Sequence, residues 1–150
     1  MMQIDIPKIA DSIIKTDNFY VANSGIIIKK IVERNVILEL PIAEIHKNHI
    51  GTAYALSIIM LMEVGGTTLI RSCYGIDNYE VIIRKIDINF IKPTTKTLVF
   101  NMELSEQQAF ELIKPIIERQ KGNFPLKIMI QDIDNELIAE ANFTFYVITK

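Results

Sequence analysis

The chain has 150 residues, 49% of them apolar, and a formal net charge of −2 at neutral pH. A chain of this length can bury a hydrophobic core without disulfides or metal ions. Its isoleucine-rich composition favours a β-rich interior over disorder. The near-neutral charge argues against a protein that binds nucleic acid through a strongly basic surface. We expect one domain over residues 1–150.

The cysteine count and the N-terminus bear on the cellular compartment. Cys73 is the single cysteine, so no intrachain disulfide can form, and a reducing compartment fits best. Met1–Lys8 is interrupted by charges and a proline and does not resemble a signal peptide. The apolar stretch Ala53–Met62 has about half of the ~20 residues needed to cross a bilayer. We expect a cytoplasmic protein with no membrane or nucleic-acid partner.

The N-terminal third predicts a helix followed by a hairpin. Apolar residues at helical spacing predict a helix from Ile6 to about Lys15, with Asp5 available as its cap. Two β-like segments follow, Gly25–Glu33 and Asn35–Ala43. The corner at Arg34-Asn35 between them indicates an antiparallel pair.

The middle of the chain predicts a helix that is buried on all sides. From Thr52 to Ile70 nearly every position is apolar or small, so no face is left for solvent. Gly65 and Gly66 each disfavour a helix interior by about 1 kcal/mol relative to alanine. Their presence indicates that another segment approaches the helix backbone closely.

The C-terminal half returns to strands. Apolar and polar residues alternate in four segments, near residues 85–91, 98–104, 126–131 and 137–147. Ser105 opens a capping-box pattern, which predicts a helix that ends before Gly122 between the second and third of these strands. A long apolar helix needs a cover, and a curved antiparallel sheet provides one. We therefore predict an α+β fold in which such a sheet wraps the buried helix, with an extra helix between strands four and five.

Glu63 is the residue that does not suit its helix. Its neighbours at helical spacing are Ile59, Met60, Gly66 and Thr67. Burying a lone carboxylate costs several kcal/mol unless it is paired or protonated, and such groups are often functional. The alternative is that Glu63 occupies a narrow exposed edge or forms a structural ion pair with Arg84 or Lys85.

The segment around this glutamate resembles a known family. Asn48, Gly51-Thr52 and an acid twelve residues after that glycine, Glu63, resemble the hotdog-fold thioesterases of the phenylacetyl-CoA type. The pattern is most similar to their bacterial relatives that lack a His-Gly-Gly signature. The resemblance extends over about residues 25–147 and includes Lys92-Pro93 after a strand.

This resemblance implies hydrolysis of acyl-coenzyme A thioesters, with coenzyme A as part of the substrate and no separate cofactor. It implies Glu63 as general base or nucleophile, Asn48 as its catalytic partner, and Gly51 and Thr52 as donors to the oxyanion. Glu63 lies ~18 Å from Gly51 along the helix, at 1.5 Å per residue. Each site is therefore expected to be shared between two chains of a homodimer or homotetramer.

Other interpretations remain open. Tyr54-Ala55-Leu56 stands where the related enzymes carry His-Gly-Gly, which leaves a non-catalytic acyl-CoA- or fatty-acyl-binding domain as the main alternative. A hydratase would need a histidine opposite the acid, and neither His46 nor His49 shows that pattern. A pure oligomerisation module would need no acid in the helix.

Several residues can be explained by ordinary structural roles. Asn48 is equally well explained as a turn residue, whereas His49 is better explained as an exposed loop residue and Tyr54 as a packing residue. Cys73 lacks a partner that would activate it. No metal-ligand cluster is recognisable. Candidates for binding the coenzyme A phosphates are Arg71, Arg84, Lys85, Lys92 and Lys96.

Overall fold

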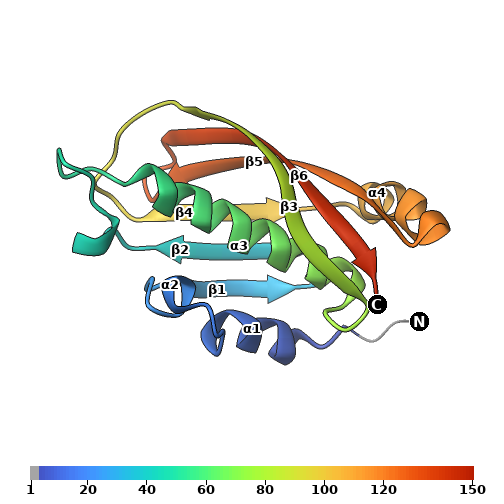
Figure 1. Ribbon diagram of the computed structural model, residues 1–150. Coiled ribbons are helices and arrows are strands. Elements are labelled where there is room, and N and C mark those ends of the chain that lie inside the picture. Colours follow the sequence, from blue (N-terminus) through green and yellow to red (C-terminus); the bar gives the residue numbers. More distant parts are fainter. Residues whose placement is uncertain (1–3) are drawn as a thin grey trace.

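A computed structural model describes residues 4–150 of the chain (Figure 1). Its elements, in chain order, are α1 (Ile6–Ile14), α2 (Phe19–Ala22), β1 (Ile27–Val32), β2 (Asn35–Leu40), a short 3-10 helix (Glu44–His46), α3 (Ala55–Tyr74), β3 (Tyr79–Phe90), β4 (Leu98–Glu103), α4 (Glu106–Arg119), β5 (Lys121–Asp132) and β6 (Leu137–Thr149).

The six strands form one sheet in the order β1-β2-β4-β5-β6-β3, and every neighbouring pair is antiparallel. The sheet curves around α3, and β3 crosses over the helix in Figure 1. Helix α3 packs against β2, β3, β4 and β5. This is the hotdog arrangement, so the predicted fold class is confirmed, including the extra helix α4 between β4 and β5.

The two glycines of α3 lie where the sheet approaches the helix most closely. A Cβ atom on Gly66 would lie 2.5 Å from Cζ of Phe145, and one on Gly65 would overlap the ring of Phe100. Both phenylalanines are fully buried. The close approach that the sequence predicted is therefore made by aromatic rings of β4 and β6.

Helix α3 begins later than predicted, at Ala55 rather than near Thr52, and runs on to Tyr74. It is long and apolar enough to span a membrane by length and composition alone, but 61% of that window is buried inside the structure. A central helix that is wrapped by a sheet has the same composition, because it too is surrounded by apolar groups.

Two strands are longer than the alternation of residue types suggested. In β3 a bulge between Ile83 and Lys85 shifts the pairing with β6, so the apolar positions change phase and the strand starts at Tyr79. In β5 the strand already begins at Lys121, directly after Gln120 ends α4 with a left-handed φ of 61°. The predicted end of α4 near Gly122 therefore lies inside a strand.

Candidate active site

Glu63 lies in the middle of α3 and is half-buried. It faces a cavity of about 170 Å³ between α3, the start of β3 and the N-terminal helices. The residues lining this Glu63 cavity are Ser12, Ile13, Thr16, Asn18, Val21, Glu63, Val64, Thr67, Thr68, Arg71 and Val81.

The carboxyl of Glu63 is poorly solvated and lacks a close partner. Burial raises the pKa of Glu63 above its usual value, and the positive charge of Arg71 offsets the rise only in part. Among residues 4–150 no basic group forms an ion pair with it. Arg84, a partner considered from the sequence, instead lies over the ring of Tyr146 at 5.0 Å and donates to Asn123 at 3.0 Å. A structural ion pair with Arg84 is therefore not formed.

Asn48 organises the loop that precedes α3. Its side-chain Oδ1 accepts hydrogen bonds from the amides of Ile50 (3.1 Å) and Thr52 (3.0 Å). Its Nδ2 donates to Oγ1 of Thr52 at 2.8 Å. Gly51 takes a positive φ of 84°, which a glycine adopts without strain. The turn-residue interpretation of Asn48 thus has direct support.

The amides predicted to hold the oxyanion are already engaged in this loop. The N–H of Gly51 donates to the carbonyl of Asn48 at 3.0 Å, and that of Thr52 donates to Oδ1 of the same residue. The sequence placed both residues in the first helical turn, whereas the helix starts three residues after Thr52. Their N–H groups are consequently not free in the structure.

The free amides at this end of α3 belong to Ala55 and Leu56. Neither N–H has a hydrogen-bond partner within residues 4–150, as expected for the first turn of a helix. Ala55 lines a cavity of about 280 Å³ together with Asn48, Phe90 and Ile91. This Asn48 cavity therefore combines an apolar wall with helix-terminal N–H donors.

The sequence-predicted residues thus fall into two cavities of one chain. Glu63 faces the cavity that Val81 borders, whereas Asn48, Thr52 and Ala55 line the cavity that Phe90 borders. Val81 and Phe90 lie near opposite ends of β3. A single chain does not bring Asn48 and Glu63 together.

Strand β3 is a long, incompletely covered edge of the sheet. Its inward side chains Val81, Ile83, Ile86 and Ile88 are only partly buried, and Phe90 is 50% exposed. The residues opposite them on β6, from Ala139 to Val147, are almost fully buried. The apolar surface that borders both cavities is therefore left open along the outer edge of β3.

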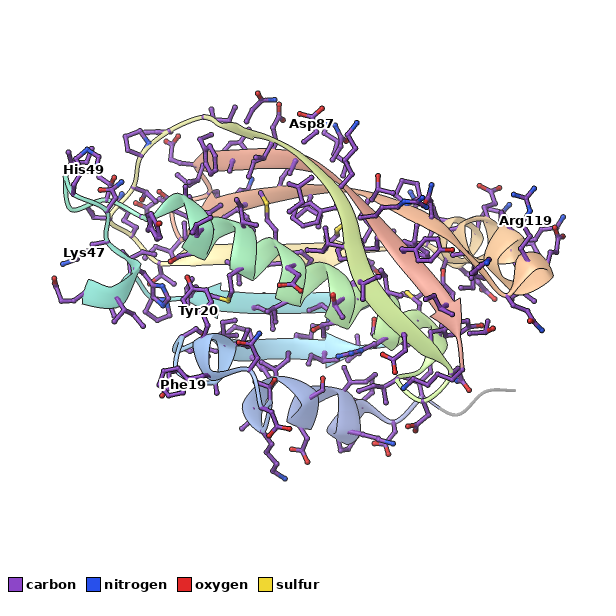
Figure 2. The ribbon with its side chains drawn as sticks, in the orientation of Figure 1. Phe19, Tyr20, Lys47, His49, Asp87 and Arg119 are labelled. Carbon is purple, nitrogen blue, oxygen red and sulfur yellow. The ribbon has the colours of Figure 1, made fainter. Side chains whose placement is uncertain are left out.

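A buried polar chain that the sequence did not reveal lies at the start of α3. His46 is 0% exposed, and its Nε2 lies 2.6 Å from the carbonyl oxygen of Ser24. A carbonyl only accepts, so Nε2 carries the proton, and in the neutral ring Nδ1 accepts from Oγ of Ser57 at 2.8 Å. Tyr20, which extends from α2 in Figure 2, contacts the same Oγ at 3.1 Å. No motif signals these contacts, because the partners are far apart in the sequence.

The histidine next in sequence behaves differently. His49 is exposed at the tip of the loop before α3 and is directed away from the sheet (Figure 2).

Burial raises the pKa of the Cys73 thiol to about 12, so the thiol stays protonated at neutral pH. Within the described part of the chain, no group of three or more potential ligands is placed to hold a metal ion.

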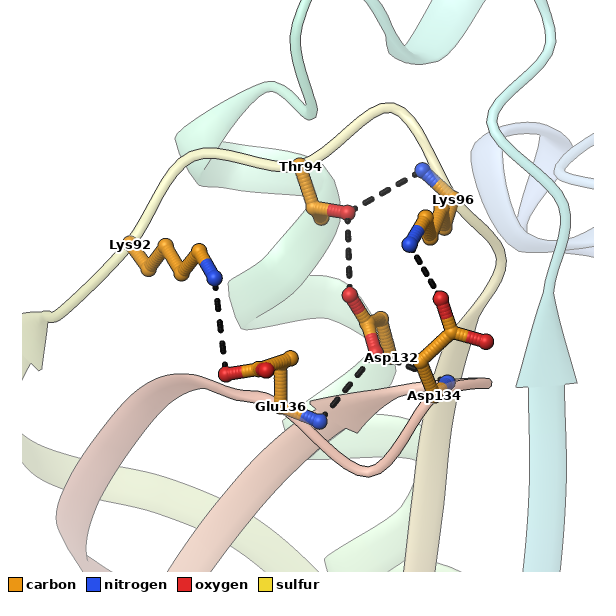
Figure 3. A network of polar contacts seen from close by, with 6 residues as sticks. All are labelled: Lys92, Thr94, Lys96, Asp132, Asp134 and Glu136. Carbon is orange, nitrogen blue, oxygen red and sulfur yellow. Dashed lines mark hydrogen bonds and ion pairs between the residues drawn. The ribbon is translucent and has the colours of Figure 1, made fainter.

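Two of the basic residues considered for phosphate binding are already paired with acids. Lys92 lies 3.4 Å from Glu136, and Lys96 pairs with Asp134, in the network of Figure 3. Asp132 holds the same hairpin by accepting from the amides of Asp134 (2.9 Å) and Glu136 (3.2 Å). These lysines therefore connect the loop between β3 and β4 to the β5–β6 hairpin.

Residues 9–147 match the family described as "Domain of unknown function (DUF4442)". No curated protein matches the sequence. Among solved structures, a protein of unknown function and probable thioesterase from Pseudomonas aeruginosa has 22% identity over 96% of each chain and a TM-score of 0.83.

Two further structures are similar over nearly their whole length. A thioesterase from Haemophilus influenzae has 16% identity and a TM-score of 0.73, covering 99% of this chain and 96% of that one. A hypothetical thioesterase from Streptococcus pneumoniae, solved with coenzyme A, has 14% identity and a TM-score of 0.68, covering 97% of this chain and 98% of that one. These similarities show the fold.

Proposed function

The chain belongs to the DUF4442 family, and we propose that it is an acyl-CoA thioesterase whose active sites are each shared by two copies of the chain. One observation carries the proposal. A half-buried carboxylate with a raised pKa, Glu63, lines a cavity in the wall of the central helix and has no ion-pair partner among residues 4–150. Such a group is suited to accept a proton from water near neutral pH.

The open edge of β3 supports the shared site. A two-fold axis that pairs β3 with β3 of a second copy places the strands antiparallel, so the start of one strand lies beside the end of the other. With the axis near the middle of the strand, Val81 of one copy lies beside Phe90 of the other. The Glu63 cavity of the first copy then adjoins the Asn48 cavity of the second.

In the proposed reaction the thioester carbonyl lies between the two cavities. Glu63 takes a proton from water as the water oxygen attacks the carbonyl carbon. The N–H groups of Ala55 and Leu56, at the positive end of α3, donate to the oxygen that becomes negative. The carbon–sulfur bond then breaks, and Glu63 returns its proton to the departing thiolate, so that one thioester and one water give a carboxylic acid and a thiol.

The relatives support the substrate class. The Haemophilus influenzae protein is described as a thioesterase, and the Streptococcus pneumoniae structure contains coenzyme A. A hotdog domain that only binds acyl-CoA would share the fold and the cavities. It would not require an unpaired acid in the central helix, which is why Glu63 decides between the two functions.

The test is thiol release from short, medium, long and aromatic acyl-CoAs by the protein and by Glu63→Gln. We expect turnover of one class, and a loss of at least about a hundredfold in the variant, the low end for removing a general base. The matched control is Glu118→Gln on the exposed side of α4, which should keep full activity. Binding of acyl-CoA without any turnover would replace the proposal by the non-catalytic function.

A mixing experiment tests the shared site. Ala55→Pro removes one proposed oxyanion donor, and proline is well tolerated at the first position of a helix. We expect this variant to lose about 10²–10³ in kcat. Mixed with Glu63→Gln at equal amounts and allowed to exchange subunits, it should restore about a quarter of all sites, because half the dimers then contain one intact site. No recovery in dimers shown to have exchanged would place both groups within one chain.

A further inference from the structure

The interior of the Glu63 cavity is unusually polar for a site that holds an acyl chain. Seven of its eleven lining residues are polar or charged, and only Ile13, Val21, Val64 and Val81 are apolar. Clefts for apolar ligands are lined mainly by apolar side chains with few polar groups. The composition of the wall therefore points to an acyl group that carries a polar atom.

Arg71 is the residue with unused donors in this wall. Glu63, Thr67 and Arg71 follow one another at intervals of four residues, so they share one face of α3. The guanidinium makes one hydrogen bond, from Nη1 to Oγ of Ser12 at 3.3 Å, and its Nε is buried without any partner. The bond to Ser12 uses only part of the guanidinium's N–H donors, so donors on its Nη atoms remain for an acceptor in the cavity that Arg71 lines.

The guanidinium of Arg71 lies on the same face of α3 as Glu63, beside which the thioester carbonyl is proposed to bind. Arg71 is eight residues beyond Glu63, ~12 Å along the helix axis. Side chains on a helix lean toward its N-terminus, so the guanidinium reaches back toward Glu63. An acyl group whose carbonyl lies beside Glu63 therefore directs its far end at Arg71.

The size of the cavity limits the length of that acyl group. A cavity of about 150 Å³ accommodates a molecule as large as benzene, with six heavy atoms. The Glu63 cavity is about 170 Å³. A short acyl group fits inside this cavity, whereas a long fatty acyl chain would extend beyond it.

The charges of the wall favour a neutral oxygen over a carboxylate. Among the described residues that line the cavity, only Glu63 and Arg71 are charged, and their charges are opposite. The nearby Glu80 acts on Arg71 but is itself paired with Lys150 at 3.1 Å. A ligand carboxylate would add a second negative charge beside Glu63 with no second cation to balance it. A hydroxyl or keto oxygen accepts the Arg71 bond without that penalty.

We propose that Arg71 is the specificity-determining residue of this site, and that the preferred substrates are short acyl-CoAs with a hydroxyl or keto oxygen on the acyl chain, bonded by the Arg71 guanidinium. This inference rests on the proposed thioesterase function, and its test separates the two. The measured quantity is a ratio, kcat/KM for 3-hydroxybutanoyl-CoA over that for butanoyl-CoA. The two substrates have the same chain length and differ in one oxygen.

In the unaltered protein we expect a ratio of at least about ten, the low end for a hydrogen bond to a charged group. In Arg71→Met, which keeps most of the side-chain volume, the ratio should fall to about one. Any change that Arg71→Met makes to Glu63 affects both substrates and cancels in the ratio. Arg119→Met, which removes an exposed arginine at the end of α4, should keep the ratio of the unaltered protein.

Acetoacetyl-CoA should behave like the hydroxylated substrate, while succinyl-CoA and decanoyl-CoA should be poor. If Arg71→Met does not fold, Arg71→Leu takes its place, because it too removes every N–H donor of the side chain. The same fall in the ratio is expected.

The outcomes are distinguishable. A ratio near one in the unaltered protein, a ratio that survives in Arg71→Met, or a preference for succinyl- or decanoyl-CoA overturns the inference while the thioesterase function stands. If no thioester is hydrolysed, the thioesterase function fails. In that case the dissociation constants of 3-hydroxybutanoyl-CoA and butanoyl-CoA are compared. A tenfold tighter binding of the hydroxylated ligand that is lost in Arg71→Met supports the role of Arg71. Equal dissociation constants in the unaltered protein overturn it.

Discussion

Glu63 and Arg71 line the same cavity on one face of α3, yet they form no ion pair within 4.0 Å. Burial raises the pKa of Glu63, and Arg71 counteracts that rise only in part. Burial likewise lowers the pKa of Arg71. Burial therefore disfavours the charged form of each group. Arg71 stays protonated, and the pKa of the Glu63 carboxyl lies above its ordinary range.

The first prediction concerns stability and pH. Because the pKa of Glu63 is higher in the folded protein than the ordinary value of 4.5, the protonated side chain favours folding. This contribution is fully present below the unfolded pKa and is lost as the pH rises through the folded pKa. Relative to Glu63→Gln, which does not titrate, the native protein should become less stable with increasing pH.

Urea unfolding of both proteins at several pH values between 4 and 8 measures this difference. Glu118→Gln, an exposed glutamate on α4, shows the effect of removing a surface carboxylate. A stability difference between the native protein and Glu63→Gln that does not change with pH would mean that Glu63 is as well solvated in the fold as in the unfolded chain.

The second prediction concerns activity and pH. A general base works only when ionised, so kcat/KM should rise with pH and level off above the raised pKa of Glu63. The initial rates of thiol release from the best acyl-CoA, measured between pH 4 and 8, give the inflection. Arg71→Met removes the positive charge that lowers this pKa, so the inflection should move to higher pH. A shift to lower pH would contradict the proposed coupling.

Much of this architecture is predictable because it follows from local patterns. The apolar surroundings of Glu63 mark α3 as the central helix, and the two glycines indicate where the sheet touches it. The capping box is formed as predicted, with Ser105 accepting from the amide of Gln108 at 3.1 Å. Each of these signals lies within a few residues of the feature that it predicts.

Other features depend on contacts that no local pattern encodes. The bond between His46 and Ser57 joins a 3-10 helix to α3, eleven residues away, with no periodic spacing. Gly51 and Thr52 are predicted to open the central helix but lie in the loop before it, because a turn and a helix start favour the same small polar residues. The contact of Arg71 with Ser12 joins residues 59 positions apart, so the sequence gives no sign of it.

The third prediction concerns Gly66. Alanine improves helix propensity by about 1 kcal/mol, but its Cβ would lie 2.5 Å from Cζ of the buried Phe145. Overpacking a core costs about 1–3 kcal/mol, and more where the neighbours cannot move. We expect Gly66→Ala to lower the free energy of unfolding in urea.

The origin of that loss can be isolated with a second substitution. Phe145→Leu removes the two nearest atoms that a Cβ on Gly66 would meet and leaves Cδ1 of Ile128 at 3.1 Å, so Gly66→Ala should be less harmful in that background. Equal losses in the two backgrounds would show that the ring of Phe145 is not what excludes alanine.

The fourth prediction separates two roles of Asn48. An aspartate at this position keeps the acceptor for the amides of Ile50 and Thr52, and the Thr52 hydroxyl can turn to donate to it. Asn48→Asp should therefore keep its stability and its activity within about tenfold, whereas Asn48→Ala loses three hydrogen bonds, each worth about 0.5–1.5 kcal/mol. A stable but inactive Asn48→Asp would instead show that the Asn48 amide group contacts the substrate.

The last prediction concerns the polar chain at the start of α3. Ser57 donates to Nδ1 of His46, which is 0% exposed. Ser57→Ala leaves that nitrogen buried without a donor, at a cost of about 1–3 kcal/mol. Tyr20→Phe removes only a hydroxyl, at the partly exposed end of these hydrogen-bonded side chains. Its loss of stability should therefore be smaller, and the hydrogen bond between Ser57 and His46 should persist.

The hydrogen bonds between Tyr20, Ser57 and His46 also connect the N-terminal helices to the Glu63 cavity. Tyr20 belongs to α2, and its neighbours Asn18 and Val21 line the Glu63 cavity. Amide hydrogen exchange should therefore speed up in residues 16–24 of Ser57→Ala while the strands stay protected. Equal losses of stability in Ser57→Ala and Tyr20→Phe, with unchanged amide exchange in residues 16–24, would mean that apolar contacts hold α2 in place and these hydrogen bonds do not.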